Sequence, residues 1–439
     1  MKRNLLTSFF VLLLIQSGYS QNFDKVKLDN YFQALEASHK YMGSVAISQD
    51  GKIMYTKAIG FKNLEEKVKP DLHTKYRIGS ISKTFTAVLL FQAIDENKII
   101  LSETILKYFP AIKNADHITI GQLLNHHSGI HNFTDDENYL TWYTQKKSEK
   151  EMVAIISKLE SDFEPGSKAA YSNSNYVLLS YILQKLYNKP YAQVLDEKII
   201  KPLGLTDTYY GGKIDLSKNE SYSYQFKGDW KKEPETDMSI PVGAGSIVST
   251  PSDLTTFAHA LFNGKLIEAP SLQQMKTIQD GYGMGLFEVP FNQHKGFHHN
   301  GGIDGFKSFF AYFPEGKIAV AHTSNGSNYD NNQISIALLS SIYHTPFHIP
   351  DFKTYVIKEK DLDQYLGLYA DKGFPMKITI SKSGSVLMAQ ATGQSGFALE
   401  PADKDIFKFD PAGIVLQFNP EAKQMTLKQG GKEFVLTKE

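Results

Sequence analysis

Apolar residues at helical spacing predict several buried helices along the chain. The run at residues 87–91 belongs to a helix that starts near Ser80 and continues to about residue 97. Residues 177–186 and 252–262 show the same spacing. Thr119 stands where an N-cap is expected, for a short helix that ends at Gly129.

Other segments have the composition and alternation of β-strands. Residues 43–47 and 53–55 flank an Asp-Gly pair, which is a strong hairpin signal, and a second hairpin is expected at residues 307–322. The pattern changes near Pro350, and residues 355–439 show short alternating runs separated by turns. We therefore expect a first domain over residues 21–350 and a small antiparallel β-domain over residues 355–439.

The first twenty residues have the pattern of a secretory signal peptide. Lys2 and Arg3 precede an apolar run at residues 5–15, and small residues follow at the positions needed for cleavage after Ser20. The run is too short to span a bilayer, and no later run is long and apolar enough. The sequence therefore predicts a secreted or periplasmic protein without a membrane span after cleavage.

Composition excludes several kinds of chemistry. Lys plus Arg equals Asp plus Glu at 47 each, so the basic surface of a nucleic-acid-binding protein is missing. The chain has no cysteine, which excludes disulfides, thiolate metal sites and cysteine nucleophiles. The neighbouring His126 and His127 would point to different helix faces, so they are interpreted as packing residues. We expect neither a metal nor a cofactor.

Ser80 and Lys83 form the only Ser-x-x-Lys pattern in the chain. Residues three apart share a helix face, so the two side chains would point the same way. A lysine among apolar side chains has a lowered pKa and can take the proton of a serine hydroxyl. The alternative is that Ser80 only caps the helix and that Lys83 lies along the surface.

Tyr171 and Asn173 lie just ahead of the helix predicted at residues 177–186. A tyrosine hydroxyl beside a lysine can act as base and later as acid. An asparagine amide can hold both the lysine and a substrate carbonyl. The same spacing recurs at Tyr329 and Asn331, where we expect a loop with no suitable helix behind it.

Glycines follow His299 at positions 301 and 302, just before the second hairpin. Glycine lets a backbone approach a ligand closely, and a strand edge there could direct an N–H group at an oxyanion. The aromatic segment 133–147 is either a solvated loop or a rim that meets the substrate.

Ser80-x-x-Lys83, Tyr171-x-Asn173 and His299-x-Gly301 stand in the order found in the serine β-lactamase and DD-peptidase superfamily. Together they resemble its class C-related branch over residues 25–345. The resemblance implies an α/β fold, in which an antiparallel sheet is flanked by helices beside an all-helical subdomain. The β-rich tail is similar to the barrel-like appendage of some secreted members.

The resemblance also implies a role for each residue. Ser80 would attack a carbonyl, while Lys83 and Tyr171 share the proton transfers. Asn173, His299 and Gly301 would bind substrate, and the backbone N–H groups of Ser80 and Gly302 would form the oxyanion hole. His299 replaces a lysine of true class C β-lactamases, which argues against efficient β-lactam hydrolysis. If His299 recognises a substrate carboxylate by charge, it would do so as a protonated cation; the alternative is that His299 is a structural residue of the strand edge.

The expected function is that of a secreted serine hydrolase that forms an acyl-enzyme at Ser80. Candidate substrates are D-amino-acid peptides, as for a DD-carboxypeptidase acting on peptidoglycan fragments, and small esters. The alternatives are a β-lactamase or a non-catalytic penicillin-binding, sensor-like module.

Overall fold

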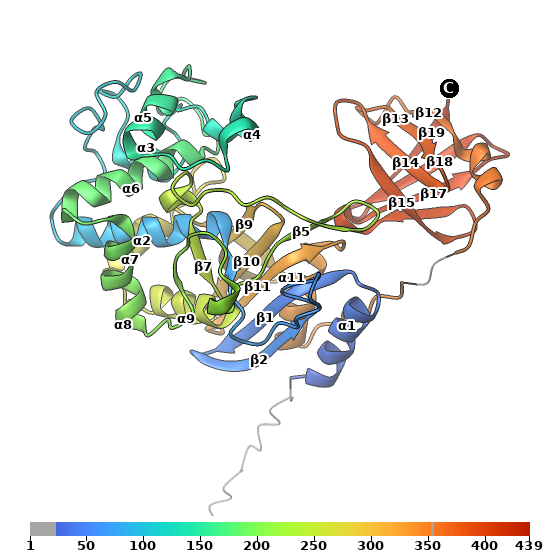
Figure 1. Ribbon diagram of the computed structural model, residues 1–439, viewed down its shortest axis with the longest axis horizontal. Coiled ribbons are helices and arrows are strands. Elements are labelled where there is room, and N and C mark those ends of the chain that lie inside the picture. Colours follow the sequence, from blue (N-terminus) through green and yellow to red (C-terminus); the bar gives the residue numbers. More distant parts are fainter. Residues whose placement is uncertain (1–22, 353–354) are drawn as a thin grey trace, which may run out of the picture.

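The computed structural model describes residues 23–352 and 355–439. Figure 1 shows a central sheet, a helical lobe beside it and a separate β-barrel. The predicted signal peptide and its cleavage site lie outside the described residues. None of the helices in the described ranges has the length and apolarity needed for a bilayer crossing.

A six-stranded antiparallel sheet forms the centre of the first domain. Both predicted hairpins are confirmed, and they become neighbours because the first strand pairs with the last. The strand order is β2 (Lys52–Ile59), β1 (Tyr41–Gln49), β11 (Ile318–Ser327), β10 (Phe306–Phe313), β9 (His294–Ile303) and β8 (Phe287–Phe291).

Helices cover both faces of this sheet. On one face, α1 (Lys25–Ala37) and α11 (Asn331–Ile342) share an apolar core with the strands. On the other face lies α9 (Pro251–Phe262), and α2 (Ser82–Asp95) packs on it through the stacked rings of Phe85 and Phe257. The second core continues from there into the helical lobe.

The helical lobe is built around α6, which contacts α2. Its helices are α3 (Ile120–Leu124), α4 (Tyr139–Trp142), α5 (Glu149–Lys158), α6 (Asn173–Tyr187), α7 (Tyr191–Leu195) and α8 (Lys201–Leu203). Other elements of the first domain are α10 (Ala269–Lys276), β3 (Tyr76–Arg77), β4 (Tyr209–Tyr210), β5 (Tyr224–Phe226), β6 (Trp230–Lys232) and β7 (Ile247–Ser249).

Two expectations about helices are wrong. The helix capped by Thr119 ends at Leu124 rather than Gly129, because His126 has a left-handed backbone with φ of 63° that cannot continue it. A helix does follow Tyr329, since α11 begins at Asn331 and Asp330 accepts a hydrogen bond from its first turn. Tyr329 bonds to Tyr31 of α1.

The predicted β-domain is a closed eight-stranded barrel. Strand β12 pairs with both β13 and β19, and apolar side chains that alternate along the strands fill the barrel. The strands are β12 (Gly367–Ala370), β13 (Ile378–Ser383), β14 (Val386–Ala391), β15 (Phe397–Asp403), β16 (Ile406–Phe409), β17 (Ile414–Asn419), β18 (Gln424–Gln429) and β19 (Lys432–Lys438). Independent folding of the two predicted domains stays a prediction.

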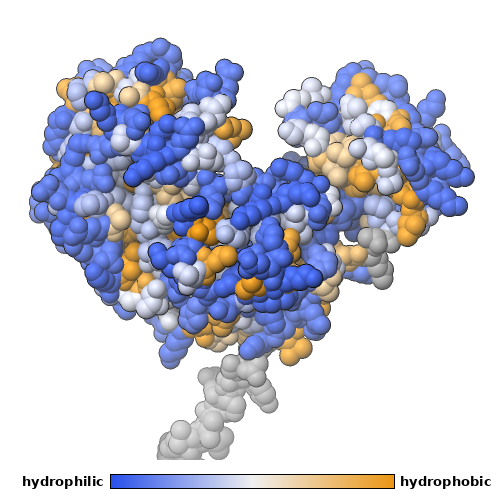
Figure 2. Space-filling model, viewed as in Figure 1, coloured by the Kyte–Doolittle hydropathy of each residue, from blue (hydrophilic) through white to orange (hydrophobic). Residues whose placement is uncertain are grey.

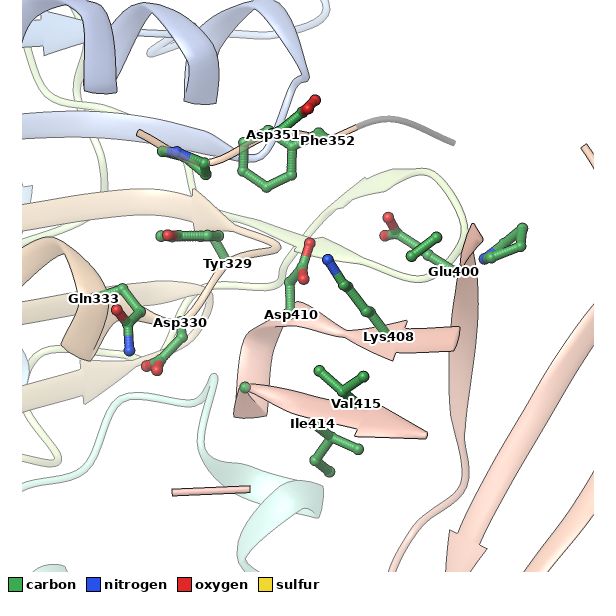
Figure 3. A pocket seen from close by; sticks show the side chains of 14 residues that line it. Tyr329, Asp330, Gln333, Asp351, Phe352, Glu400, Lys408, Asp410, Ile414 and Val415 are labelled. Carbon is green, nitrogen blue, oxygen red and sulfur yellow. The ribbon is translucent and has the colours of Figure 1, made fainter. Parts of the chain in front are cut away.

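An ion-pair cluster joins the barrel to the first domain. The buried Lys40 ammonium lies 2.5 Å from a Glu400 carboxylate oxygen and 2.9 Å from one of Asp410. Asn328 donates a further hydrogen bond to Glu400 at 2.9 Å. Beside this cluster is a cavity of about 270 Å³ that is lined by both domains, including Tyr329 and Lys408 (Figure 3).

We predict that Lys40→Ala loosens the docking of the barrel. Without the ammonium, Glu400 and Asp410 keep two unpaired carboxylates at the interface. Small-angle X-ray scattering should then report a larger radius of gyration than for the wild type. Lys52→Ala is the control, since Lys52 is an exposed lysine of the first domain with no ion pair among the described residues. An unchanged radius for Lys40→Ala would contradict this role.

Candidate active site

A tight turn presents Ser80 beside strand β9. Ser80 lies in a short 3-10 turn, Gly79–Ile81, that leads directly into α2, as the sequence predicted. Gly79 has φ of 50°, and a Cβ there would lie 2.7 Å from the Gly302 nitrogen. At Gly301 a Cβ would lie 1.9 Å from the carbonyl oxygen of Ile78. Both positions therefore need glycine, which lets β9 lie against the turn that carries Ser80.

Lys83 is buried, and its Nζ is surrounded by three oxygen atoms. It lies 3.0 Å from Ser80 Oγ, 2.7 Å from Asn173 Oδ1 and 2.8 Å from the carbonyl oxygen of Ala244. Burial lowers the pKa of Lys83 well below its ordinary value, because no carboxylate in the described part of the chain compensates for the lost hydration. The structure thus excludes the surface position that was the alternative for Lys83.

The three contacts direct the lone pair of a neutral Lys83 amine. A neutral amine has two N–H donors and one lone pair. The oxygens of Asn173 and Ala244 can only accept, so they take the two N–H groups. The lone pair then faces Ser80, whose hydroxyl can donate to it. This arrangement suits proton transfer from serine to lysine.

Tyr171 also lies beside the Lys83 amine. The Lys83 Nζ is 4.9 Å from the centre of the Tyr171 ring. Burial raises the pKa of Tyr171, and a hydrogen bond with Ser80 offsets only part of that shift. The phenol therefore keeps its proton and has it available as a hydrogen-bond donor or general acid.

His126 supports Tyr171, a role that the sequence did not reveal. Its ring lies 4.6 Å from the Tyr171 ring, and its Nδ1 accepts a hydrogen bond from the Ser172 N–H at 3.1 Å. Burial, with the nearby Lys83 as a smaller cause, lowers the pKa of His126 well below its ordinary value. The left-handed turn that ends α3 early is what places this neutral imidazole here.

Asn173 is the first residue of α6 and is held at both ends of its amide. Its Oδ1 accepts from Lys83, while its Nδ2 donates to Asn132 Oδ1 and Thr134 Oγ1, both at 3.1 Å. The amide hydrogens are therefore occupied, and a substrate carbonyl could bind them only by displacing Asn132 or Thr134. Asn173 holds the lysine as predicted, whereas its contact with substrate stays a prediction.

The aromatic segment 133–147 was expected to be either a solvated loop or a rim of the site, and its two ends differ in this respect. Phe133 is buried and its ring packs on Tyr139 and Trp142. Thr134 contacts Asn173, so this end of the segment belongs to the wall of the site. Leu140 is exposed on α4. This helix lies on the side of the helical lobe that faces the barrel (Figure 1), and Figure 2 shows a hollow between the lobe and the barrel.

His299 is not a cation in this structure. It is buried, its Nδ1–H donates to the Asn300 carbonyl oxygen at 2.6 Å, and its ring packs on Phe287. Burial, with repulsion from Lys83 as a smaller cause, lowers the pKa of His299 to about 3. A buried, neutral His299 argues against recognition of a substrate carboxylate by charge, and the contact of His299 with substrate stays a prediction.

Arg77 is a second residue whose importance the sequence did not reveal. It is buried three positions before Ser80, and it donates to Asp304 Oδ2 at 2.8 Å and Glu235 Oε2 at 3.0 Å. Asp304 follows the glycines of β9 and also accepts from the Thr236 N–H and hydroxyl. This network fixes the end of β9 relative to the turn of Ser80.

Residues 28–339 match the model of the family described as Beta-lactamase. The chain belongs to this family. Its antiparallel sheet with flanking helices is the β-lactamase-like fold, followed by the barrel. As a member of this family of serine hydrolases, the chain carries the serine, lysine and tyrosine within one buried cluster.

Two similar curated proteins are bacterial. Teichoic acid D-alanine hydrolase of Staphylococcus aureus is 28% identical over 303 residues, which cover 67% of this chain and 72% of that protein. Penicillin-binding protein 4* of Bacillus subtilis is 23% identical over 448 residues and covers 92% of this chain and 97% of its own length.

Solved structures of this β-lactamase family agree with the fold. D-amino acid amidase from Ochrobactrum anthropi, complexed with L-phenylalanine amide, is 25% identical with a TM-score of 0.63, covering 72% of this chain and 99% of its own. The octameric penicillin-binding protein homologue from Pyrococcus abyssi is 22% identical, with a TM-score of 0.67. The match covers 94% of this chain and 100% of that chain, so it includes the barrel.

We predict that the low pKa of Lys83 makes stability depend on pH. Between the folded pKa and 10.5, the unfolded chain binds one more proton at Lys83 than the folded chain does. The free energy of unfolding should therefore rise with pH across this window. In Lys83→Met this contribution disappears, so the free energy of unfolding should rise more steeply with pH in the wild type than in Lys83→Met.

Urea denaturation of both proteins at a series of pH values measures the difference between the two curves. His299→Asn is the control at pH values well above 6.5, where His299 is neutral in the folded and the unfolded chain, while Lys83 stays in place. Parallel curves for the wild type and Lys83→Met would show that Lys83 titrates with its ordinary pKa.

Proposed function

We propose that this member of the Beta-lactamase family hydrolyses esters or amides of D-amino acids through an acyl-enzyme at Ser80. One observation carries the proposal: the Nζ of the buried Lys83 lies 3.0 Å from Ser80 Oγ, and its two other contacts are with oxygens of Asn173 and Ala244 that can only accept hydrogen bonds. A structural serine or lysine would not need this arrangement.

In the proposed reaction, Lys83 takes the proton of Ser80 as Oγ attacks the substrate carbonyl. The backbone N–H groups of Ser80 and Gly302 stabilise the oxyanion, because both belong to segments that the glycine contacts hold together. Tyr171 then donates its proton to the leaving group and is reprotonated by Lys83. Water enters, and the same groups in reverse roles release the acid from Ser80.

The names of the relatives and the charge of the site support D-amino-acid esters and amides. The similar proteins include a D-alanine hydrolase and a D-amino acid amidase. His299 is neutral and Arg77 is paired with Asp304 and Glu235, so the described residues leave no free cation in the buried part of the site for the carboxylate of a β-lactam. Esters and amides that need no buried cation fit this part of the site.

We predict that Ser80→Ala abolishes turnover of D-alanine esters. Loss of a serine nucleophile lowers kcat by several orders of magnitude, about 10⁴-fold or more. Release of D-alanine from the ester measures the rate. Ser172→Ala is a matched control, because this buried hydroxyl beside Tyr171 has no hydrogen-bond partner among the described residues. Activity of Ser80→Ala above a few per cent of wild type would refute the mechanism.

We also propose that the protein is exported, on the basis of its N-terminal pattern. The full chain expressed in a bacterium with a periplasm should be recovered outside the cytoplasm with Gln21 as its first residue. Mass spectrometry of the purified protein measures this. A cytoplasmic protein that retains residues 1–20 would contradict the proposal.

A further inference from the structure

Gly302 differs from the other two glycines of the site. At Gly79 and Gly301 a Cβ would collide with backbone, whereas at Gly302 the nearest atom to a Cβ would be Lys307 Nζ at 3.6 Å. The backbone of Gly302 does not have a positive φ either. Neither steric space nor backbone conformation therefore requires glycine at position 302. Because Gly302 has no side chain, a gap lies beside the Lys307 ammonium.

Lys307 lies opposite Gly302 on the neighbouring strand β10. Opposite residues of antiparallel strands place their side chains on the same face, so Lys307 projects beside Gly302. Its side chain is exposed and has no ion pair or hydrogen bond among the described residues. It is thus a cation without a partner among the described residues, beside the part of β9 that β8 leaves unpaired. It projects from the sheet face opposite to the one against which the Ser80 turn packs, because Ser308 and Gly301 contact Ile78 on that other face.

Two further polar groups lie on this face of the sheet. Ser324 is opposite Lys307 on β11, and its buried hydroxyl has no hydrogen-bond partner among the described residues. Asn300 is two positions before Gly302 on β9, so its side chain also lies on this face. Its Oδ1 accepts from His298 at 3.1 Å, while no described residue accepts from its NH₂ group.

We propose that Lys307, with Asn300, forms a subsite for an anionic group of the substrate, next to the scissile carbonyl. This inference rests on the proposed function, because it assumes that the carbonyl oxygen lies at the Gly302 N–H. The anion would lie within a few bonds of the carbonyl carbon. A carboxylate of a peptide leaving group and a phosphate of a polyol phosphate ester share this chemistry.

Matched pairs of substrates test whether the anionic group is a carboxylate or a phosphate. D-alanyl-D-alanine and D-alanyl-D-alaninamide differ only in the carboxylate, and D-alanyl glycerol phosphate and D-alanyl glycerol differ only in the phosphate. In Lys307→Met, kcat/KM should fall roughly five- to tenfold for the anionic member of the pair that the enzyme uses. The neutral member should change less than twofold.

Further variants test whether charge is what matters. Lys307→Arg should keep the preference for the anionic substrate, and Lys307→Glu should reverse it. Added salt should reduce the preference in the wild type and leave Lys307→Met unaffected. Lys295→Met is the matched control, since Lys295 is on β9 at the end away from Gly302 and pairs with Glu288. Equal effects of Lys307→Met on both members of each pair would overturn the inference.

Binding gives a second measurement that needs no turnover. Calorimetric titration of the Ser80→Ala protein with D-alanyl-D-alanine and with glycerol 1-phosphate should show binding of at least one, and Lys307→Met in the same background should weaken it. If neither ligand responds to Lys307→Met, the subsite does not exist. If the wild type hydrolyses none of the four substrates but the binding difference is present, the proposed function fails and the anion site stands.

Discussion

The site depends on one constraint, which is that the Lys83 amine is buried with no carboxylate partner among the described residues. Burial disfavours an ammonium here and favours the neutral amine, whose two N–H groups Asn173 and Ala244 can accept. Each neighbour of Lys83 then has a definite task. The lone pair of the amine faces the Ser80 hydroxyl, and a protonated Tyr171 lies beside Ser80 and Lys83. The histidines nearby are kept uncharged by the same burial.

Three parts of the chain must meet for this cluster to form. The turn of Ser80 starts α2, Asn173 starts α6, and the glycines of β9 let the strand approach that turn. Arg77 then fixes the end of β9 through Asp304. The barrel is joined at a distinct place, through Lys40, and it faces the helical lobe across the hollow seen in Figure 2.

The elements with strong local signals were predictable from sequence. The Asp-Gly hairpin, the cap at Thr119 and the alternation of the tail all depend on neighbouring residues, and the order of the motifs indicated the family. What the sequence could not predict depends on tertiary burial. A histidine in place of a lysine suggested a cation, but His299 is enclosed and neutral. The position of Lys307 beside Gly302 could be recognised only from the register of β9 and β10, in which the two residues are opposite each other.

Covalent labelling tests the central claim most directly, namely that Lys83 activates Ser80. The full chain would be treated with a fluorophosphonate, digested and examined by mass spectrometry. We expect one adduct on the peptide that carries Ser80, formed faster as pH rises through the lowered pKa of Lys83, and at least about a hundredfold slower in Lys83→Met. An adduct on another residue, or equal labelling rates in the wild type and Lys83→Met, would contradict the account.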